Sequence, residues 1–273
     1  MKKREFLKIY SLGILSAATL THSRFSFAKS PDTIRVGVRG GVDEEIWEVV
    51  TQVAKDNGLR VQPIVLSGAV SPNEAVQNGD LEANSFQHIP FLRDQNAQRG
   101  YSLVSIGNTY ISPVAFYSKK YKNLKDLPAG ARVGIPNDPS NQTRALVVLR
   151  DQGLIDLKPG FDPFKGTASL ADVTANHQNI ELAEIASVVL SRSLDDLAAA
   201  AIVNSFAYQV GLIATRDGIA VEKSDNNPYV NIIAVHSKNA EAPWVKPLLA
   251  AYQSEPVRQF IQKKYQGSVI PVF

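Results

Sequence analysis

The sequence predicts an α/β fold, in which helices cross over between the strands of a sheet. Short apolar segments alternate with segments of helical periodicity from Ile34 onward, and Gly or Pro residues mark many of the boundaries. Such alternation is typical of α/β sheets. The sequence contains no internal repeat, heptad array or low-complexity segment, and its composition does not define a linker. Pattern alone therefore permits a single α/β domain.

The first elements are expected to be strand, helix and strand. A glycine pair ends the first strand, residues 34–38, and a helix begins at the acidic triplet from Asp43. The helix ends at Gly58, since glycine readily adopts the left-handed conformation of a helix terminus. Residues 61–66 form the next strand. The apolar face of the helix consists of residues at helical spacing, Ile46, Val49, Val50, Val53 and Ala54.

The segment Ser71-Pro72-Asn73-Glu74 predicts the start of a second helix. Serine is a preferred N-cap, proline suits the first helical position, and the glutamate completes a capping box. This short helix is expected to close at Gly79.

The remaining elements continue the alternation. Extended segments are expected at residues 103–106 and 114–117, and strands at 132–135, 180–182, 199–203 and 228–235. Helices are expected near residues 89–98, after residue 138 and from Ser169, and a single helical turn is expected at 194–197. Two C-terminal helices are expected, with a break between them at Pro256. Residues 158–166, rich in Pro and Gly, are expected to form a loop.

The N-terminus, residues 1–28, is predicted to be a cleavable signal peptide. Basic residues precede an apolar run at 9–20, which is too short to span a bilayer, and Ser26-Phe27-Ala28 provides a small-x-small cleavage motif. The flanking Lys3-Arg4-Glu5-Phe6-Leu7-Lys8 looks like a twin-arginine export signal with lysine in the first arginine position, and the general secretory route remains open.

Removal of this segment would leave 24 Lys and Arg against 25 Asp and Glu, which changes the net charge from +3 to −1. In the chain that remains, no basic run is longer than the Lys119-Lys120 pair. Nucleic-acid binding needs a concentrated positive surface. The sequence therefore gives no support for a nucleic-acid partner.

Motifs of several enzyme classes are missing from the sequence. It has no cysteine, hence no thiol nucleophile, and its four histidines, at 22, 88, 177 and 236, show no metal-ligand spacing. Neither Gly-x-Ser-x-Gly nor a P-loop is present. We therefore expect no metal, no cofactor and no enzymatic activity.

Residues 135–146, Ile-Pro-Asn-Asp-Pro-Ser-Asn-Gln-Thr-Arg-Ala-Leu, end an apolar strand, turn, and begin a helix with Arg144 in its first turn. Free backbone amides and the helix dipole favour an anion at such a terminus. A guanidinium beside them can add a bidentate contact to a carboxylate or phosphate. The pattern predicts an anion-binding turn, and a surface arginine beside a capped helix is the alternative.

A second strand-to-helix turn lies at residues 83–92, Ala-Asn-Ser-Phe-Gln-His-Ile-Pro-Phe-Leu, with Pro90 suited to the first helical turn. With these two turns, the sequence resembles the NlpA family of substrate-binding proteins, the methionine-binding components of ABC importers. The resemblance covers nearly the whole mature chain. Further ordered matches are Ser71-Pro72-Asn73, Tyr117-Ser118-Lys119-Lys120-Tyr121, Arg192-Ser193-Leu194-Asp195-Asp196, Pro228-Tyr229-Val230-Asn231 and Phe260-Ile261-Gln262-Lys263-Lys264-Tyr265-Gln266-Gly267.

The resemblance implies a two-lobed periplasmic-binding-protein fold, type II-like, with a ligand cleft between the lobes. The chain would cross near residues 110–114 and return near 227–231. Lobe 1 would contain residues 29–112 and 228–273, and lobe 2 residues 113–227.

By resemblance, Arg144 would bind a ligand carboxylate, and Asn141 on the same turn would add a polar contact. Phe86 and His88 would line the opposite wall, and Asn231 would contribute from the returning segment. On the pattern of the sequence alone, a structural role is favoured for His88 and a core position for Phe86, whereas Asn231 could equally be a strand-end hydrogen-bonding residue. Two amphipathic aromatics near the crossings, Tyr110 and Tyr229, are weaker candidates, since they could simply pack between the lobes.

Two departures from the family pattern concern specificity. Ala69 stands where methionine binders of the family usually have an aromatic residue, and Val203 stands where they usually have an asparagine, with Asn204 one position later. We expect a more open side-chain pocket, and an amino-group contact that is lost or is rebuilt by Asn204.

The function implied by the resemblance is that of an extracytoplasmic solute-binding protein. It would deliver a small carboxylate-bearing ligand, methionine or another amino acid or relative, to an ABC permease with its cytoplasmic ATPase. The acylated cysteine that anchors many family members is missing, so no lipid anchor and a freely soluble periplasmic protein are expected. The alternatives are a periplasmic sensor that has lost transport and, less favoured, an enzyme acting on a small organic acid.

Overall fold

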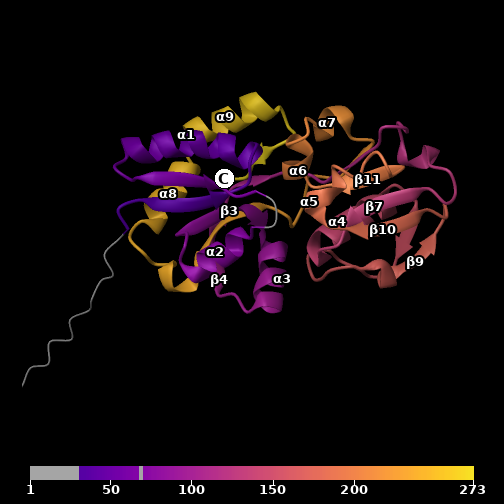
Figure 1. The fold of residues 1–273 in the computed structure, drawn as a ribbon, viewed down its shortest axis with the longest axis horizontal. Coiled ribbons are helices and arrows are strands. Elements are labelled where there is room, and N and C mark those ends of the chain that lie inside the picture. The colour runs from indigo at the N-terminus through magenta and orange to yellow at the C-terminus, as the bar shows by residue number, and fades with distance from the viewer. Residues whose placement is uncertain (1–30, 68–69) are drawn as a thin grey trace, which may run out of the picture.

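The computed structural model of the protein describes residues 31–67 and 70–273. The predicted signal peptide, residues 1–28, lies outside the described residues. The chain forms two α/β lobes side by side, each built on a five-stranded sheet (Figure 1). The two-lobed α/β architecture predicted from the sequence is therefore confirmed.

The sheet of lobe 1 combines strands from both ends of the chain. Its order is β2 (Val61–Val65), β1 (Ile34–Val38), β3 (Ala83–His88), β13 (Asn231–His236) and β4 (Leu103–Asn108). β1 is parallel to β2 and β3, whereas β13 runs antiparallel to β3 and β4. The register places Asn231 opposite His88, so two predicted site residues lie side by side.

Helices cover both faces of this sheet. α1 (Val42–Asp56), α8 (Val245–Tyr252) and α9 (Glu255–Tyr265) lie on one face, and α2 (Pro72–Asn78) and α3 (Ile89–Arg99) on the other (Figure 1). Along β13, Ile233 and Val235 join the core under α1, whereas Ile232 and Ala234 join the core under α2. This alternation is expected of a strand that is buried on both faces.

The sheet of lobe 2 has the order β10 (Glu181–Ile185), β7 (Arg132–Pro136), β11 (Ala199–Ile202), β6 (Ala115–Tyr117) and β12 (Ala220–Val221). α4 (Pro139–Asp151) and the pair β8 (Ile155–Leu157) and β9 (Val173–Asn176) pack on one face. α5 (Ser187–Leu190), α6 (Asn204–Tyr208) and α7 (Ala214–Asp217) pack on the other. Gly134 on β7 allows the close approach of α5, because a Cβ there would lie 2.8 Å from Leu190 Cδ2.

Two segments, residues 109–114 and 222–230, connect the sheets. The first contains β5 (Tyr110–Ile111), which pairs with β14 (Ile270–Pro271) near the C-terminus. The lobe boundaries given above for residues 29–112, 113–227 and 228–273 remain a prediction. Among residues 31–67 and 70–273, none of the helices combines the length and the hydropathy that a membrane span requires.

Most elements form where the sequence predicts them. Ser71 caps α2 by accepting the Glu74 N–H, and Gly79 ends this helix in the left-handed conformation. Gly58 has a φ of 78° just beyond α1, which fits its predicted role. These elements follow local rules that do not depend on the rest of the fold.

Several sequence predictions are wrong in detail. The helix expected from Ser169 is a short 3-10 turn, Leu170–Asp172, followed by β9, because Val173 pairs with Leu157 of β8. The helical turn expected at 194–197 is a single hydrogen-bonded turn, in which the Asp196 N–H donates to the Ser193 carbonyl at 3.1 Å, and the helix of this region is α5. The strand expected from 228 begins at Asn231.

The C-terminal break is also displaced from its predicted position. α8 ends at Tyr252 and α9 begins at Glu255, so Pro256 lies in the first turn of α9 rather than between the helices. Proline is favoured there because its missing N–H has no partner in a first turn.

Candidate functional site

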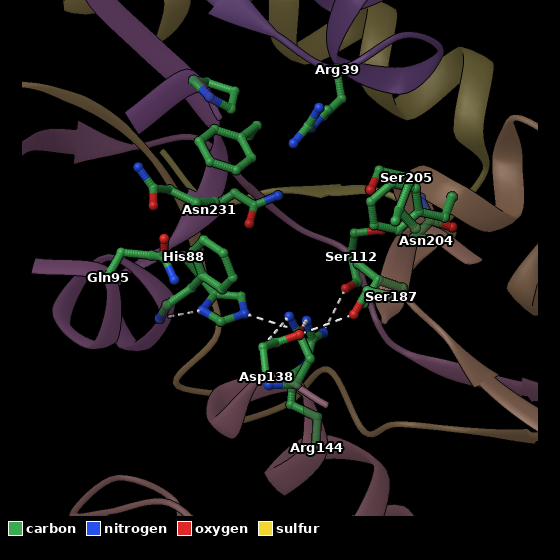
Figure 2. A pocket seen from close by; sticks show the side chains of 18 of the residues that line it. Arg39, His88, Gln95, Ser112, Asp138, Arg144, Ser187, Asn204, Ser205 and Asn231 are labelled. Atoms are coloured by element: carbon green, nitrogen blue, oxygen red, sulfur yellow. Dashed lines mark hydrogen bonds between the residues drawn. The ribbon is translucent and has the colours of Figure 1, made fainter. Parts of the chain in front are cut away.

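A cavity of about 430 Å³ lies between the two lobes (Figure 2). This volume is within the range of about 300–1,000 Å³ that is typical of small-molecule sites. Lobe 1 and the first connecting segment contribute Arg39, Ser71, Pro72, Phe86, Gln87, His88, Phe91, Gln95, Arg99, Tyr110, Ser112 and Asn231. Lobe 2 contributes Asp138, Asn141, Arg144, Ala186, Ser187, Val188, Val203, Asn204, Ser205 and Phe206.

The lobe-2 wall is organised by the N-terminus of α4. Asp138 is the N-cap, and its Oδ1 accepts hydrogen bonds from the backbone N–H of Asn141 at 3.0 Å and from the Asn141 side-chain Nδ2 at 2.9 Å. Ser187 Oγ donates to Asp138 Oδ2 at 3.0 Å. The predicted turn thus orients Asn141, but its own N-cap carboxylate already occupies part of the anion-attracting terminus. Because α4 begins at Pro139, Arg144 lies in its second turn and not in the predicted first turn.

Arg144 is buried and paired with Glu222. Its guanidinium Nε lies 3.0 Å from Glu222 Oε1, and Nη2 lies 2.5 Å from Glu222 Oε2. The exposed fractions of the two side chains are 2% and 5%. The ring of Tyr229 stacks on the guanidinium, with 4.9 Å from Cζ to the ring centroid. The positive charge predicted for the anion site is therefore balanced by an internal carboxylate.

Further hydrogen bonds fix the guanidinium. Nη2 also donates to the Ser112 carbonyl at 2.8 Å, and Nη1 lies 3.3 Å from Asn141 Oδ1. Because arginine has five N–H donors, one N–H on Nη1 remains for a ligand. Arg144 can thus offer one preoriented donor, and a bidentate clamp would require Glu222 or Ser112 to move.

His88 connects the two lobes. It is the N-cap of α3, and its Nδ1 accepts the Phe91 N–H at 3.1 Å. We therefore place the proton on Nε2, which lies 3.3 Å from Asn141 Oδ1. Burial foremost, and the nearby Arg144 charge second, lower the pKa of His88 to about 3. The imidazole is consequently neutral at physiological pH.

His88 is expected to show no titration in the folded protein between about pH 5 and 8, unlike a free histidine. The unfolded chain takes up this proton below about pH 6.5, while the folded chain does not. The His88 contribution to folding stability should therefore be lost as the pH falls from about 6.5 towards 3. Imidazole NMR shifts followed against pH, with His88→Asn to assign the signal, would check this. A midpoint near that of free histidine would contradict the buried, neutral geometry.

The other predicted site residues also line the cavity. Phe86 lies beside Phe91, with 6.0 Å between ring centroids. Asn231 opens β13 next to His88. The weaker candidate Tyr229 packs on His88 with 5.1 Å between centroids, and Tyr110 donates to Asp43 Oδ1. The fold thus brings Arg144, Asn141, His88, Phe86 and Asn231 to one cavity.

An amide cluster stiffens the lobe-1 wall behind the cavity. Asn73 Nδ2 donates to Gln87 Oε1 at 2.8 Å, and Asn84 Nδ2 donates to Asn73 Oδ1 at 2.9 Å. All three side chains are buried. A fully bonded buried amide network holds its members in one arrangement. Asn73 of the Ser71-Pro72-Asn73 motif therefore fixes the first turn of α2 to β3.

Of the two positions at which the sequence departs from the family pattern, the structure describes only Val203. Ala69 lies outside the described residues. Val203 lines the cavity and is followed by Asn204, which also lines it and is buried. Among residues 31–67 and 70–273, the Asn204 side chain has no hydrogen-bond partner. An amide is therefore available beside the position where the family usually carries one.

Sequence reasoning missed several residues of this site. Arg39, Gln95, Ser187 and Ser205 line the cavity, and Glu222 pairs with Arg144 from behind it. None belongs to a motif with a known spacing, although the glycine-rich turn after Arg39 marked a strand end. Among the described residues, no group of three or more metal-ligating side chains is arranged to hold a metal ion.

The paired sheets, the interlobe cavity and its polar wall define a periplasmic-binding-protein fold of the type II-like class predicted above. The profile of the NlpA lipoprotein family matches residues 34–273. The protein belongs to this family.

Similar proteins include the D-methionine-binding lipoprotein MetQ of Escherichia coli strain K12, which is 42% identical over 245 residues, 89% of each chain. Among solved structures, a nutrient binding protein from Burkholderia cenocepacia bound to methionine is 46% identical, with a TM-score of 0.84 over 88% of this chain and 100% of that one. An ABC transporter periplasmic substrate-binding protein from Coxiella burnetii is 38% identical, with a TM-score of 0.82 over 88% and 100%.

Proposed function

We propose that this protein is an extracytoplasmic solute-binding protein that delivers a small carboxylate-bearing ligand, methionine or another amino acid or relative, to an ABC importer. The observation that carries the proposal is the cavity to which both lobes contribute polar side chains, Arg144 and Asn141 from one and His88 and Asn231 from the other. Relatives named as methionine-binding and as ABC transporter substrate-binding proteins support it.

In this proposal, the free Nη1 donor of Arg144 contacts the ligand carboxylate, and Glu222 holds the guanidinium in position. Asn141 and Asn231 provide further polar contacts, and His88 and Phe86 form the wall beside the ligand. The side chain of Asn204, buried without a protein partner, accepts a hydrogen bond from the ligand amino group. Asn204 would thus replace the contact that Val203 cannot make.

The ligand itself should be identified from protein purified without refolding. Native mass spectrometry, followed by release and analysis of bound small molecules, is expected to yield a carboxylate-bearing compound that the protein leaves chemically unchanged. A bound compound without a carboxylate, or conversion of the compound during incubation, would contradict the proposal.

L-Methionine is expected to bind less tightly than to MetQ-like relatives. Ala69 removes an aromatic contact of the kind that contributes about 0.5–1.5 kcal/mol beyond area burial. Since Asn204 keeps a partner for the amino group, the loss is expected to come from the missing ring. Calorimetric titration of ligand-free protein with L-methionine, D-methionine and other amino acids measures this. Restoration of affinity in an Ala69→Tyr variant would support the aromatic contact, and selective nanomolar methionine binding by the unaltered protein would contradict the prediction.

The proposed partners are an ABC permease and its cytoplasmic ATPase, and the proposed location is the periplasm, reached through the signal peptide by the twin-arginine route or the general secretory route. The expectation of no lipid anchor gains no support from the relatives, which are named lipoproteins. Detergent-phase partition of the protein from its native host would decide this expectation, since an acylated protein enters the detergent phase.

A further inference from the structure

Arg39 lines the interlobe cavity from lobe 1, just after β1 ends. Its side chain is half-buried and lies over the ring of Phe86, with 5.4 Å from Cζ to the ring centroid. Nη1 donates to the Leu66 carbonyl at 3.0 Å. Since arginine has five N–H donors, most of them remain available towards the cavity. Figure 2 shows the guanidinium pointing into the cavity.

No acidic side chain among residues 31–67 and 70–273 forms an ion pair with Arg39. Two other arginines show the contrast. Arg35, on β1, donates to both carboxylate oxygens of Glu82, and Arg144 is paired with Glu222. A partly desolvated charge without a partner is unfavourable. The fold therefore supplies a counter-ion for Arg35 and Arg144 and supplies none for Arg39.

Asp43 is the acid whose charge acts on Arg39, and it neutralises the guanidinium charge only in part. Asp43 is buried and accepts a hydrogen bond from the Tyr110 hydroxyl. Burial raises the pKa of the Asp43 carboxyl to about 7, so it is only partly ionised at neutral pH. The pKa of Arg39 is lowered, because its own burial outweighs the attraction of Asp43.

Arg39 and Arg144 reach the cavity from opposite lobes and lie on opposite sides of it (Figure 2). We propose that Arg39 forms a second anion-binding subsite, so that the preferred ligand carries a negative group at the end opposite the carboxylate held by Arg144. The ligand class is an amino acid or similar carboxylate whose other end is a carboxylate, sulfonate or phosphate. This inference rests on the proposed function, in which Arg144 holds the first carboxylate.

Phe86 makes the surroundings of this subsite partly apolar. Its ring lies against both Arg39 and Phe91, so the walls around the guanidinium are partly apolar. A charge-assisted hydrogen bond is stronger where water is excluded. A terminal anion would therefore bind more strongly here than at an exposed arginine, because the fold has already removed part of the water from the Arg39 guanidinium.

The test uses two pairs of ligands that differ in terminal charge and little in shape. L-Homocysteate and L-methionine sulfone share one skeleton, with a sulfonate oxygen in place of a methyl group, and L-glutamate and L-glutamine form the second pair. Calorimetric titration of ligand-free protein is expected to favour the charged member by about 10- to 150-fold, the range for a hydrogen bond to a charged group. This comparison needs no variant.

Arg39→Met keeps the packing on Phe86 and removes the charge. It is expected to abolish the preference for the charged member, because L-homocysteate loses an ionic partner whereas L-methionine sulfone loses at most a weaker, neutral hydrogen bond. Arg60→Met, at an exposed arginine of the same lobe that lies outside the cavity, is the control for the change in net charge. It should retain the preference.

The possible outcomes separate this inference from the proposed function. Equal binding of charged and neutral members by the unaltered protein would overturn the subsite and leave the solute-binding proposal standing. Equal weakening of both members by Arg39→Met would place Arg39 at the first carboxylate and also overturn it. Failure of every amino acid to bind would overturn the proposed function, and the inference with it.

Discussion

Replacing Glu222 with alanine is expected to destabilise the protein by about 3–5 kcal/mol, the range for removing one partner of a buried ion pair. Glu222 accepts two of the hydrogen bonds that satisfy Arg144 and also accepts the Val114 N–H at 3.0 Å. The substitution would leave a buried guanidinium without its counter-ion and a backbone donor without its acceptor. Equilibrium unfolding in urea, with its linear dependence of free energy on denaturant, measures the loss.

A surface acid of the same lobe provides the control. Glu181 lies 3.4 Å from Arg132, and both side chains are more than half exposed. Glu181→Ala should cost no more than about 1 kcal/mol, since exposed ion pairs contribute little. If Glu222→Ala were as mild as Glu181→Ala, the buried pair would not be a determinant of stability.

Removing the Arg144 side chain is expected to weaken ligand binding by about 2–5 kcal/mol, or roughly 30- to 5,000-fold. Arg144 supplies the donor that faces the cavity and orients Asn141 through its 3.3 Å contact. Arg144→Met alone would also leave Glu222 buried without a partner, so its effect on binding would be mixed with an effect on folding.

The double variant Arg144→Met with Glu222→Met separates these effects. Replacing both members of a buried ion pair with apolar residues of similar size is often neutral for stability. We therefore expect the double variant to fold but not to recover binding. Calorimetric titration with the ligand recovered from the native protein decides the matter. Undiminished affinity in this variant would remove Arg144 from the binding site.

Local sequence rules determined the parts of the fold that depend on neighbouring residues. Asp138 and Pro139 begin α4 because a capping carboxylate and a proline suit a first turn wherever it is placed. Ser71 and Gly79 bound α2 for the same kind of reason. The helix expected from Ser169 failed, since the pairing of β9 with β8 joins residues that no local rule connects.

The candidate site shows the same division. The resemblance to a family placed Arg144, Asn141, His88, Phe86 and Asn231 together, and the structure brings them to one cavity. The resemblance gave no indication that Glu222, 78 residues after Arg144, would accept hydrogen bonds from the Arg144 guanidinium. It gave no indication that Arg39 would enter the opposite side of the cavity without an acidic partner.

By itself, the sequence determined the class of fold, the family and the residue types available to bind an anion, because periodicity, caps and motifs are properties of nearby residues. Only the tertiary structure decided which of the arginines is neutralised. Charge balance depends on distances between residues remote in sequence, and burial sets how strongly each unpaired charge acts. Arg35 and Arg144 receive carboxylates from the fold, whereas Arg39 is left for the cavity.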